Sequence, residues 1–242
     1  MEENYKPKFY AKYVSTHNAR LFGKLTADVA SGFFPVFSGH YTRFLPADKK
    51  ACILDLGCGN GALVYWLQSI GFSEAAGVDV SPEQAEIAKS LGAKNIYCES
   101  LVDFLEKSKT EYDLIFIRDT LGHFNKKEIF NIMELMYGNT KKGGKLIIKT
   151  PNAESPLSGQ LRYGDFTHEV GFTRTSLQQL AEVVGFERTE AYSTPPVVHG
   201  LKSGVRFLLW KFIELCIRFY RLVDAGNGEG IYTQNVIVAA YK

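Results

Sequence analysis

One stretch of the chain, Ile53-Leu54-Asp55-Leu56-Gly57-Cys58-Gly59-Asn60-Gly61, carries its clearest structural signal. An apolar strand runs into a turn with glycine at every second position, and the apolar segment 62–70 continues as a helix. Glycine permits positive φ angles and the close approach of a ligand, because it has no Cβ. The first turn of the helix offers unpaired N–H groups. The pattern therefore predicts a nucleotide-binding turn.

The acidic residues near this turn indicate which nucleotide it binds. Gly57, Gly59 and Ala62 also fit the dinucleotide pattern G-x-G-x-x-G/A, which alone is a weak signal. The carboxylate of Asp55 would repel a pyrophosphate and attract an ammonium group. Asp79 ends the next apolar strand, where an acid accepts hydrogen bonds from ribose hydroxyls. S-adenosylmethionine has no phosphate and carries an ammonium and a sulfonium, so the two acids favour it as the cofactor.

These motifs resemble those of the class I S-adenosylmethionine-dependent methyltransferases, whose first motif is D/E-x-G-x-G-x-G. The resemblance covers residues 50–185, and residues 231–241 fit the last strand of the family. It implies that the first acid and the glycines line the methionine group, the second acid binds the ribose and a valine packs on the adenine. The implied cofactor-binding residues are Asp55, Gly57, Gly59, Gly61, Asp79 and Val80. A phosphate loop or dinucleotide site is the alternative.

Length, charge and cysteine content limit the remaining choices. The 242 residues fit one large α/β domain whose core needs neither disulfides nor a structural metal. The four cysteines show no C-x-x-C spacing, and the net charge of +2 gives no reason to expect a nucleic-acid partner. The sequence shows no signal peptide and no apolar run long enough to span a membrane. We expect a cytoplasmic protein, with peripheral contact to the inner membrane surface as an open alternative.

From residue 52 onward, apolar strands alternate with amphipathic helices. This order and the resemblance predict a Rossmann-like α/β fold, with a seven-stranded, mostly parallel sheet, helices on both faces and an antiparallel last strand. Strands are expected at 52–56, 75–79, 95–98, 114–118 and 145–150. A helix at 82–91 has Ser81 as its N-cap. We expect one domain, 1–242, with a cap at 1–50, a core at 51–194 with a lid at 153–172, an insertion at 195–230 and the last strand at 231–242.

The aromatic and basic residues of the first fifty positions precede the sheet, so we expect them to cap its ligand-binding edge. Helices are expected at 19–30 and 37–44, separated by Gly32 and Pro35. The candidates for closing over the cofactor or the acceptor are Tyr13, His17 and His40. Simple packing is the alternative for the tyrosine and the second histidine.

The ends of the third and fourth strands supply further candidates. Where the resemblance places an acid that binds the adenine amino group, this chain has Ser100, so its hydroxyl or a backbone group takes that contact. We count Leu101 and Arg118 with the cofactor-binding residues and Asp119 with the acceptor-binding residues. The segment lacks an N-P-P-Y or D-P-P-Y run, which argues against methylation of DNA bases. His123 resembles a family histidine that is either structural or a base.

The lid is long enough to be functional, and its aromatic, Arg, Asp and His side chains suit an ordered substrate lid. An alcohol acceptor must lose its proton as the new bond forms, and imidazole exchanges protons near neutral pH. His168 is therefore the first candidate for the catalytic base, with a structural role as the alternative. Asp165 would orient it or bind the acceptor, and Arg162 or Tyr163 would contact a carboxylate, phosphate or sugar ring. No spacing requires a metal, and none is assigned.

A helix at 177–184, capped by Thr175 or Ser176, follows the lid. An insertion then replaces the short hairpin that the family would have. Within it, residues 201–223 predict a basic amphipathic helix whose six charges exclude a membrane span. Packing on its own domain or on a partner subunit is the first interpretation, contact with an anionic leaflet the second, and a substrate wall the third.

Three features together resemble bacterial enzymes that methylate sugars during polysaccharide or lipopolysaccharide assembly. They are Tyr13-Val14-Ser15-Thr16-His17, the lid segment Asp165-Phe166-Thr167-His168-Glu169, and the late basic helix. The resemblance implies a sugar or glycan hydroxyl as the acceptor. A small lipophilic acceptor, such as a quinone precursor or natural product, is the alternative in the same reaction class. A non-catalytic or dinucleotide-binding module is the third hypothesis.

Overall fold

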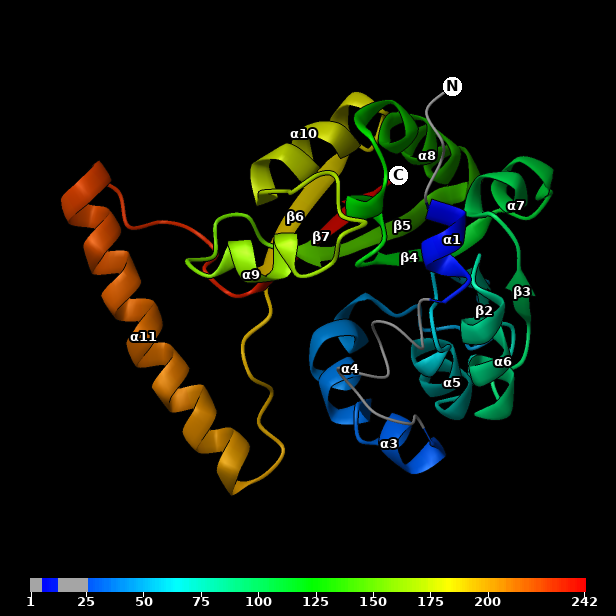
Figure 1. The fold of residues 1–242 in the computed structure, drawn as a ribbon, viewed down its shortest axis with the longest axis horizontal. Coiled ribbons are helices and arrows are strands. Elements are labelled where there is room, and N and C mark those ends of the chain that lie inside the picture. The colour runs from blue at the N-terminus through cyan, green and yellow to red at the C-terminus, as the bar shows by residue number, and fades with distance from the viewer. Residues whose placement is uncertain (1–5, 13–25) are drawn as a thin grey trace.

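A computed structural model describes residues 6–12 and 26–242 of the chain. Its strands form one seven-stranded sheet in the order β3-β2-β1-β4-β5-β7-β6 (Figure 1). The pairs within β3-β2-β1-β4-β5 are parallel, and β7 runs antiparallel to both β5 and β6. The predicted Rossmann-like fold is therefore confirmed. Tyr13 and His17 lie outside the described residues, as does most of the predicted helix 19–30.

The sheet consists of β1 (Ile53–Leu56), β2 (Ala76–Asp79), β3 (Ile96–Cys98), β4 (Tyr112–Arg118), β5 (Thr140–Pro151), β6 (Arg188–Ser193) and β7 (Asn235–Tyr241). One face is covered by α3 (Ala27–Ser31), α4 (Phe34–Tyr41), η2 (Thr42–Phe44), α5 (Ala62–Ser69) and α6 (Pro82–Ser90). The other face is covered by α7 (Leu101–Lys107), α8 (Lys126–Asn139) and α10 (Arg174–Val183). The remaining elements are α1 (Lys6–Tyr10), η3 (Leu121–His123), α9 (Ser158–Tyr163) and α11 (Leu201–Ala225).

The alternation of side chains along β4 explains the two-sided core. Leu114 and Phe116 point into the cluster under α4 and α5, whereas Ile115 and Ile117 point into the cluster under α8 and α10. All four side chains are buried. A strand that is buried on both faces reads as a continuous apolar run, and this is why its sequence predicted a central parallel strand.

Several boundaries differ from the predictions, and three of them can be explained by contacts in the structure. Pro35 does not separate two helices but lies in the first turn of α4, where its missing N–H costs no hydrogen bond. The cap of α10 is Thr173, not Thr175 or Ser176, because the Thr173 hydroxyl and Ser176 form a reciprocal capping box. β5 starts at Thr140, earlier than predicted, and Gly143 N–H donates to the Lys242 carbonyl beside the end of β7.

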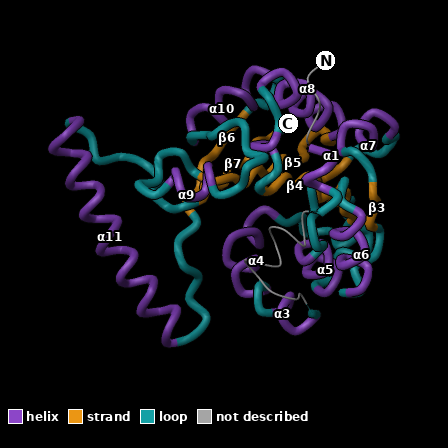
Figure 2. The backbone as a smooth tube through the Cα atoms, viewed as in Figure 1, coloured by secondary structure: helices purple, strands orange, loops and turns teal. Residues whose placement is uncertain are grey.

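The carboxyl ends of β1, β2, β4 and β5 meet at one edge of the sheet. Leu56 pairs with Val78 and with Ile117, and Arg118 pairs with Lys149. The loops after these strands hold most of the candidate residues, as expected for an open α/β sheet. β6 ends and β7 begins at the same edge, so the insertion that carries α11 leaves from there. Figure 2 shows α11 standing beside the sheet and its covering helices.

Candidate active site

The three glycines of the turn have different structural roles, although all have positive φ. A Cβ added to Gly57 would lie 2.2 Å from Thr120 Oγ1, and one added to Gly61 would lie 2.5 Å from the Cβ of Ala88. These two glycines therefore allow close packing of the turn on its neighbours. A Cβ added to Gly59 would meet nothing nearer than 3.9 Å. Of the three, Gly59 is the one that leaves room for a ligand.

Replacing Gly61 by alanine is expected to destabilise the fold by about 2 to 3 kcal/mol, because the new methyl group clashes with α6 and the backbone has a left-handed conformation. Urea unfolding measures the loss. Gly138→Ala is the matched control, since its added Cβ meets nothing within 4 Å and its position lies in α8. Equal stability of the two variants would contradict the packing role of Gly61.

Asp79 ties the glycine turn to the end of β2. Its Oδ2 accepts from Gly59 N–H at 2.8 Å and its Oδ1 from Ser81 N–H at 2.9 Å. Burial raises the pKa of Asp79, and these two backbone donors oppose the rise. Each carboxylate oxygen can accept a second hydrogen bond. The carboxylate is therefore positioned to accept from ribose hydroxyls, with the half-exposed Val80 beside it.

The surroundings of Gly59 fit a nucleoside cofactor. The Oε1 atom of Gln84 is buried and accepts no hydrogen bond from the described residues, and its side chain is the one nearest to the space at Gly59. Ser100 is the N-cap of α7 and its hydroxyl makes no capping bond. The Leu101 side chain is buried in the core, so its predicted contact with a cofactor rests on its backbone.

Asp55 is fully buried and forms an ion pair with Arg118, at 3.2 Å between Arg118 Nη2 and Asp55 Oδ2. Burial raises the pKa of Asp55 above its ordinary value, while Arg118 opposes this rise. The guanidinium also lies over the Phe37 ring, 5.5 Å from its centroid. The turn is therefore flanked by a carboxylate and a guanidinium together. The amino-acid end of a methionine group, which carries one ammonium and one carboxylate, complements such a pair.

Arg118→Met is expected to cost about 3 kcal/mol of unfolding free energy near pH 7, because it leaves a buried carboxylate unpaired. The pKa of Asp55, already raised, would rise further. The folded state would then bind a proton that the unfolded chain releases, so the loss should shrink as the pH falls toward about 4. Urea unfolding at both pH values measures this. Lys141→Met, which removes the ion-pair partner of the partly exposed Asp113, should cost less than about 1 kcal/mol.

Asp119 follows Arg118 and has a left-handed backbone, with φ 54°. Its Oδ2 is bound to the ammonium of Lys149, and its Oδ1 is buried without a hydrogen-bond donor among the described residues. His40 on α4 is nearby, and its pKa is lowered first by burial and then by the positive charges of Lys149 and Arg43. The structure thus groups Asp119 and His40 around a lysine that the sequence analysis did not select. A lysine directly after the apolar run 146–148 of β5 was the available signal.

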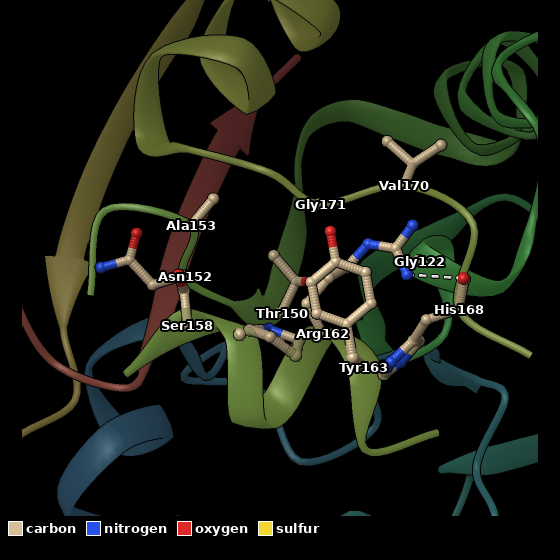
Figure 3. A pocket seen from close by; sticks show the side chains of 12 residues that line it. Gly122, Thr150, Asn152, Ala153, Ser158, Arg162, Tyr163, His168, Val170 and Gly171 are labelled. Atoms are coloured by element: carbon tan, nitrogen blue, oxygen red, sulfur yellow. Dashed lines mark hydrogen bonds between the residues drawn. The ribbon is translucent and has the colours of Figure 1, made fainter. Parts of the chain in front are cut away.

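The lid and the end of β5 enclose a pocket of about 310 Å³ (Figure 3). Its polar and aromatic lining comes from Thr150, Asn152, Ser158, Arg162, Tyr163 and His168, and glycines, Pro151, Ala153 and Val170 complete it. The Arg162 guanidinium donates to the carbonyls of His168 and Glu169. Arg162 therefore holds the lid in place, while the Tyr163 side chain is 80% exposed at the pocket.

His123 is a neutral, structural imidazole in this arrangement. Its Nδ1 lies 2.8 Å from the Thr167 hydroxyl and its Nε2 lies 3.1 Å from the Asp119 carbonyl oxygen. The backbone N–H of Thr167 donates to Asp165 Oδ1 at 2.9 Å, so Asp165 orders the lid backbone. Burial, and then His168, lower the pKa of His123 to about 4. Both ring nitrogens are engaged, which leaves no lone pair for the role of base that was predicted for it.

His168 differs from its neighbour in having an unpartnered ring nitrogen. Its ring lies against that of His123, with 4.5 Å between centroids, and its Nδ1 is buried without a hydrogen bond to any described residue. The lid backbone is pinned to η3, because Glu169 N–H and Val170 N–H both donate to the Gly122 carbonyl. The imidazole is therefore held at a fixed place in the pocket wall.

The start of the chain covers this lid. Lys6 of α1 pairs with Glu169 at 2.6 Å, and Phe9 stacks on Phe166 with 5.4 Å between ring centroids. The rings of Tyr10 and His123 pack in a T-shaped arrangement, with 6.4 Å between their centroids. These contacts agree with a cap near the ligand-binding edge, and they belong to residues that the sequence analysis did not select. Within the described ranges, no three His, Cys, Asp or Glu side chains are grouped so as to hold a metal.

With this geometry in place, comparison with known proteins decides the family. Residues 34–191 match the family described as a methyltransferase domain. The chain belongs to this family. A solved S-adenosylmethionine-dependent methyltransferase from Archaeoglobus fulgidus has a similar fold, with a TM-score of 0.69 and 18% identity over 95% of this chain and all of that one. The family, the fold and the glycine turn bound by Asp79 all indicate S-adenosylmethionine as the cofactor of this methyltransferase domain, as predicted.

Relatives with curated names are similar to parts of the methyltransferase domain. The ubiquinone biosynthesis O-methyltransferase of Rickettsia akari is 31% identical over 119 residues, which are 48% of this chain and 45% of that protein. The human EEF1A lysine methyltransferase 2 is 30% identical over 164 residues, 66% of this chain and 63% of that protein. The chain thus spans about half to two thirds of the length of these relatives, whose acceptors differ from each other.

Proposed function

We propose that this methyltransferase domain methylates a sugar hydroxyl during the assembly of bacterial surface glycans. The observation that carries the proposal is the pocket beside the lid. Thr150, Asn152 and Ser158 offer it hydrogen-bonding groups, and the exposed Tyr163 ring offers an apolar face of the kind on which sugar rings stack. His168, with its unpartnered Nδ1, supplies a proton acceptor in the same wall.

When bound, S-adenosylmethionine would supply an electrophilic methyl group for transfer to the acceptor oxygen, with its sulfur as the leaving group. The protein positions the reactants and excludes water, which lowers the barrier by several kcal/mol. Asp79, Gly59 and the pair formed by Asp55 and Arg118 would hold the cofactor. His168 takes the proton that the hydroxyl loses, and Arg162 keeps His168 in place through the lid backbone.

A small lipophilic acceptor is the second candidate, because one similar protein is a ubiquinone biosynthesis O-methyltransferase. A quinone precursor would favour a pocket lined mainly by phenylalanine and leucine. The lining residues include neither, which supports the sugar over the lipophilic acceptor. The resemblance to sugar methyltransferases in the lid and in the late helix supports it as well.

The decisive experiment incubates the protein with S-adenosylmethionine labelled in the methyl group. One arm contains sugar nucleotides and glycan extracts, and the other contains catechols and quinone precursors. Label in the carbohydrate fraction is the expected result. Label in the phenolic arm alone would assign the second candidate. If the protein binds S-adenosylhomocysteine but no label appears in either arm, the sugar proposal is overturned. If the protein binds NAD and not S-adenosylhomocysteine, the choice of S-adenosylmethionine as the cofactor is wrong.

A further inference from the structure

The 25-residue helix α11 lies apart from the core of the domain (Figures 1 and 2). Ser203 is its only buried residue. The interpretation that this helix packs its apolar face on its own domain is therefore wrong. A partner subunit, a membrane surface or a substrate remains to cover that face.

The outward side of α11 is apolar over an unusually wide arc. At about 100° per residue, ten positions fall within about 140° of the helix circumference. These residues, which we call the exposed apolar face, are Leu201, Val205, Leu208, Leu209, Phe212, Leu215, Cys216, Phe219, Leu222 and Val223. All ten are exposed, and the leucines and phenylalanines among them are more than half exposed. Soluble proteins rarely leave such a continuous apolar surface without a binding role.

Five basic residues lie outside the exposed apolar face, and three of them, Lys202, Lys211 and Arg218, are at its borders. The five are Lys202, Arg206, Lys211, Arg218 and Arg221, against the two acids Glu214 and Asp224. Glu214 is already bound by Lys211 at 2.8 Å and by Arg218 at 3.0 Å. The helix therefore offers an excess of positive charge beside an apolar strip. An apolar strip with basic borders is complementary to a leaflet of anionic lipids.

A second copy of the chain is a poorer match to this face. Leucines recur every seven residues at 201, 208, 215 and 222, which is the spacing of a two-helix seam. Such a seam would cover a narrow stripe and leave Leu209, Val223 and the neighbouring Ile213 in water. Both acids of α11 lie on the far half of the helix, so pairing with α11 of a second copy would bring no carboxylate of that helix to the basic borders. A flat surface of anionic lipids would cover the whole exposed apolar face, and its head groups would neutralise the basic side chains at the borders.

We propose that α11 docks the protein on an anionic lipid surface, with the exposed apolar face in the leaflet and the basic residues among the head groups. Within the described ranges, no helix is long and apolar enough to cross a membrane. The helix, about 37 Å long, would lie in the plane of the surface. This inference goes beyond the proposed function, because it is independent of which acceptor the site takes.

The connections of α11 place the candidate active site near that surface. The preceding segment packs on α4, since a Cβ added to Gly39 would lie 2.7 Å from the Val197 side chain. The returning segment is held by Arg218, which donates to the carbonyls of Gly228 and Gly230, and by Asn152, whose amide donates to the carbonyls before β7. Both segments join the sheet at the edge that carries the pocket. Docking through α11 would thus bring the pocket to acceptors that are anchored in lipid.

Sedimentation of the full chain with vesicles tests the proposal. Vesicles with about 30% phosphatidylglycerol are expected to bind the protein at least about tenfold better than pure phosphatidylcholine, and salt should weaken the binding. Leu208→Ser/Phe212→Ser/Leu215→Ser should lose at least about tenfold of the binding, without a change in unfolding midpoint, because the face is exposed in the folded protein. Val29→Ser/Phe130→Ser/Val183→Ser is the matched control, since it removes three exposed apolar side chains from other helices.

Charge reversal and light scattering complete the test. Lys202→Glu/Arg206→Glu/Arg221→Glu should abolish the preference for phosphatidylglycerol while the apolar face stays intact. The proposal is overturned if neither kind of vesicle binds, or if the serine triple variant binds as well as its control. A dimer in light scattering that dissociates in the serine variant, with no vesicle binding, would assign the face to a second copy instead.

Discussion

Asp79→Ala is expected to weaken the binding of S-adenosylhomocysteine by about a hundredfold to ten-thousandfold in calorimetry. The variant loses two charge-assisted hydrogen bonds to the ribose, each worth about 1.5 to 3 kcal/mol. It also removes the acceptor that holds Gly59 N–H, so the turn itself loses its connection to β2. The two effects act in the same direction, because an unanchored turn must be ordered again when the cofactor binds.

The matched control for Asp79 is Asp113→Ala on the same sheet. Asp113 also accepts from a backbone N–H, that of Cys52 at 2.7 Å, and it pairs with Lys141 at 2.8 Å. It lies at the opposite end of β4, away from the carboxyl edge. Asp113→Ala removes similar contacts from the folded protein, so it should lose a comparable amount of unfolding free energy and keep its affinity for S-adenosylhomocysteine. Equal affinities of the two variants would remove Asp79 from the cofactor site.

The sequence predicted the sheet well because its signals are local. The run 114–117 is apolar on both faces, and Ser81 and Pro82 begin α6 through contacts within one turn. The glycine turn was found for the same reason. The different roles of its three glycines were not predicted. Thr120 and Ala88, the neighbours that require glycine at 57 and 61, come from distant parts of the chain.

The candidate site was harder to predict, because its contacts join residues far apart in sequence. The Asp55 and Arg118 pair spans 63 positions and the contact of His123 with Thr167 spans 44. No periodicity reports such pairings. The sequence placed the Asp55 carboxylate beside the cofactor but did not predict its ion pair with Arg118. With the guanidinium beside it, the pair complements both the ammonium and the carboxylate of a methionine group. Thr167, Lys149 and Gln84 entered the site only through the fold.

His168→Gln is expected to lower the turnover number by at least about a hundredfold, while the affinity for S-adenosylhomocysteine changes by less than about threefold. Glutamine keeps a polar side chain of similar length and cannot accept the proton. His199→Gln, which changes an exposed histidine of the insertion, should alter neither quantity.

The pair of stacked imidazoles makes this test selective. His123 has both nitrogens engaged and a pKa lowered to about 4, so it stays neutral and leaves the proton to His168. If His168 only packed against the lid, its replacement would lower the free energy of unfolding and leave the turnover number of the folded protein unchanged. A loss of stability with turnover retained would therefore remove His168 from proton transfer, whereas loss of turnover in a stable variant that still binds S-adenosylhomocysteine requires its imidazole as the base.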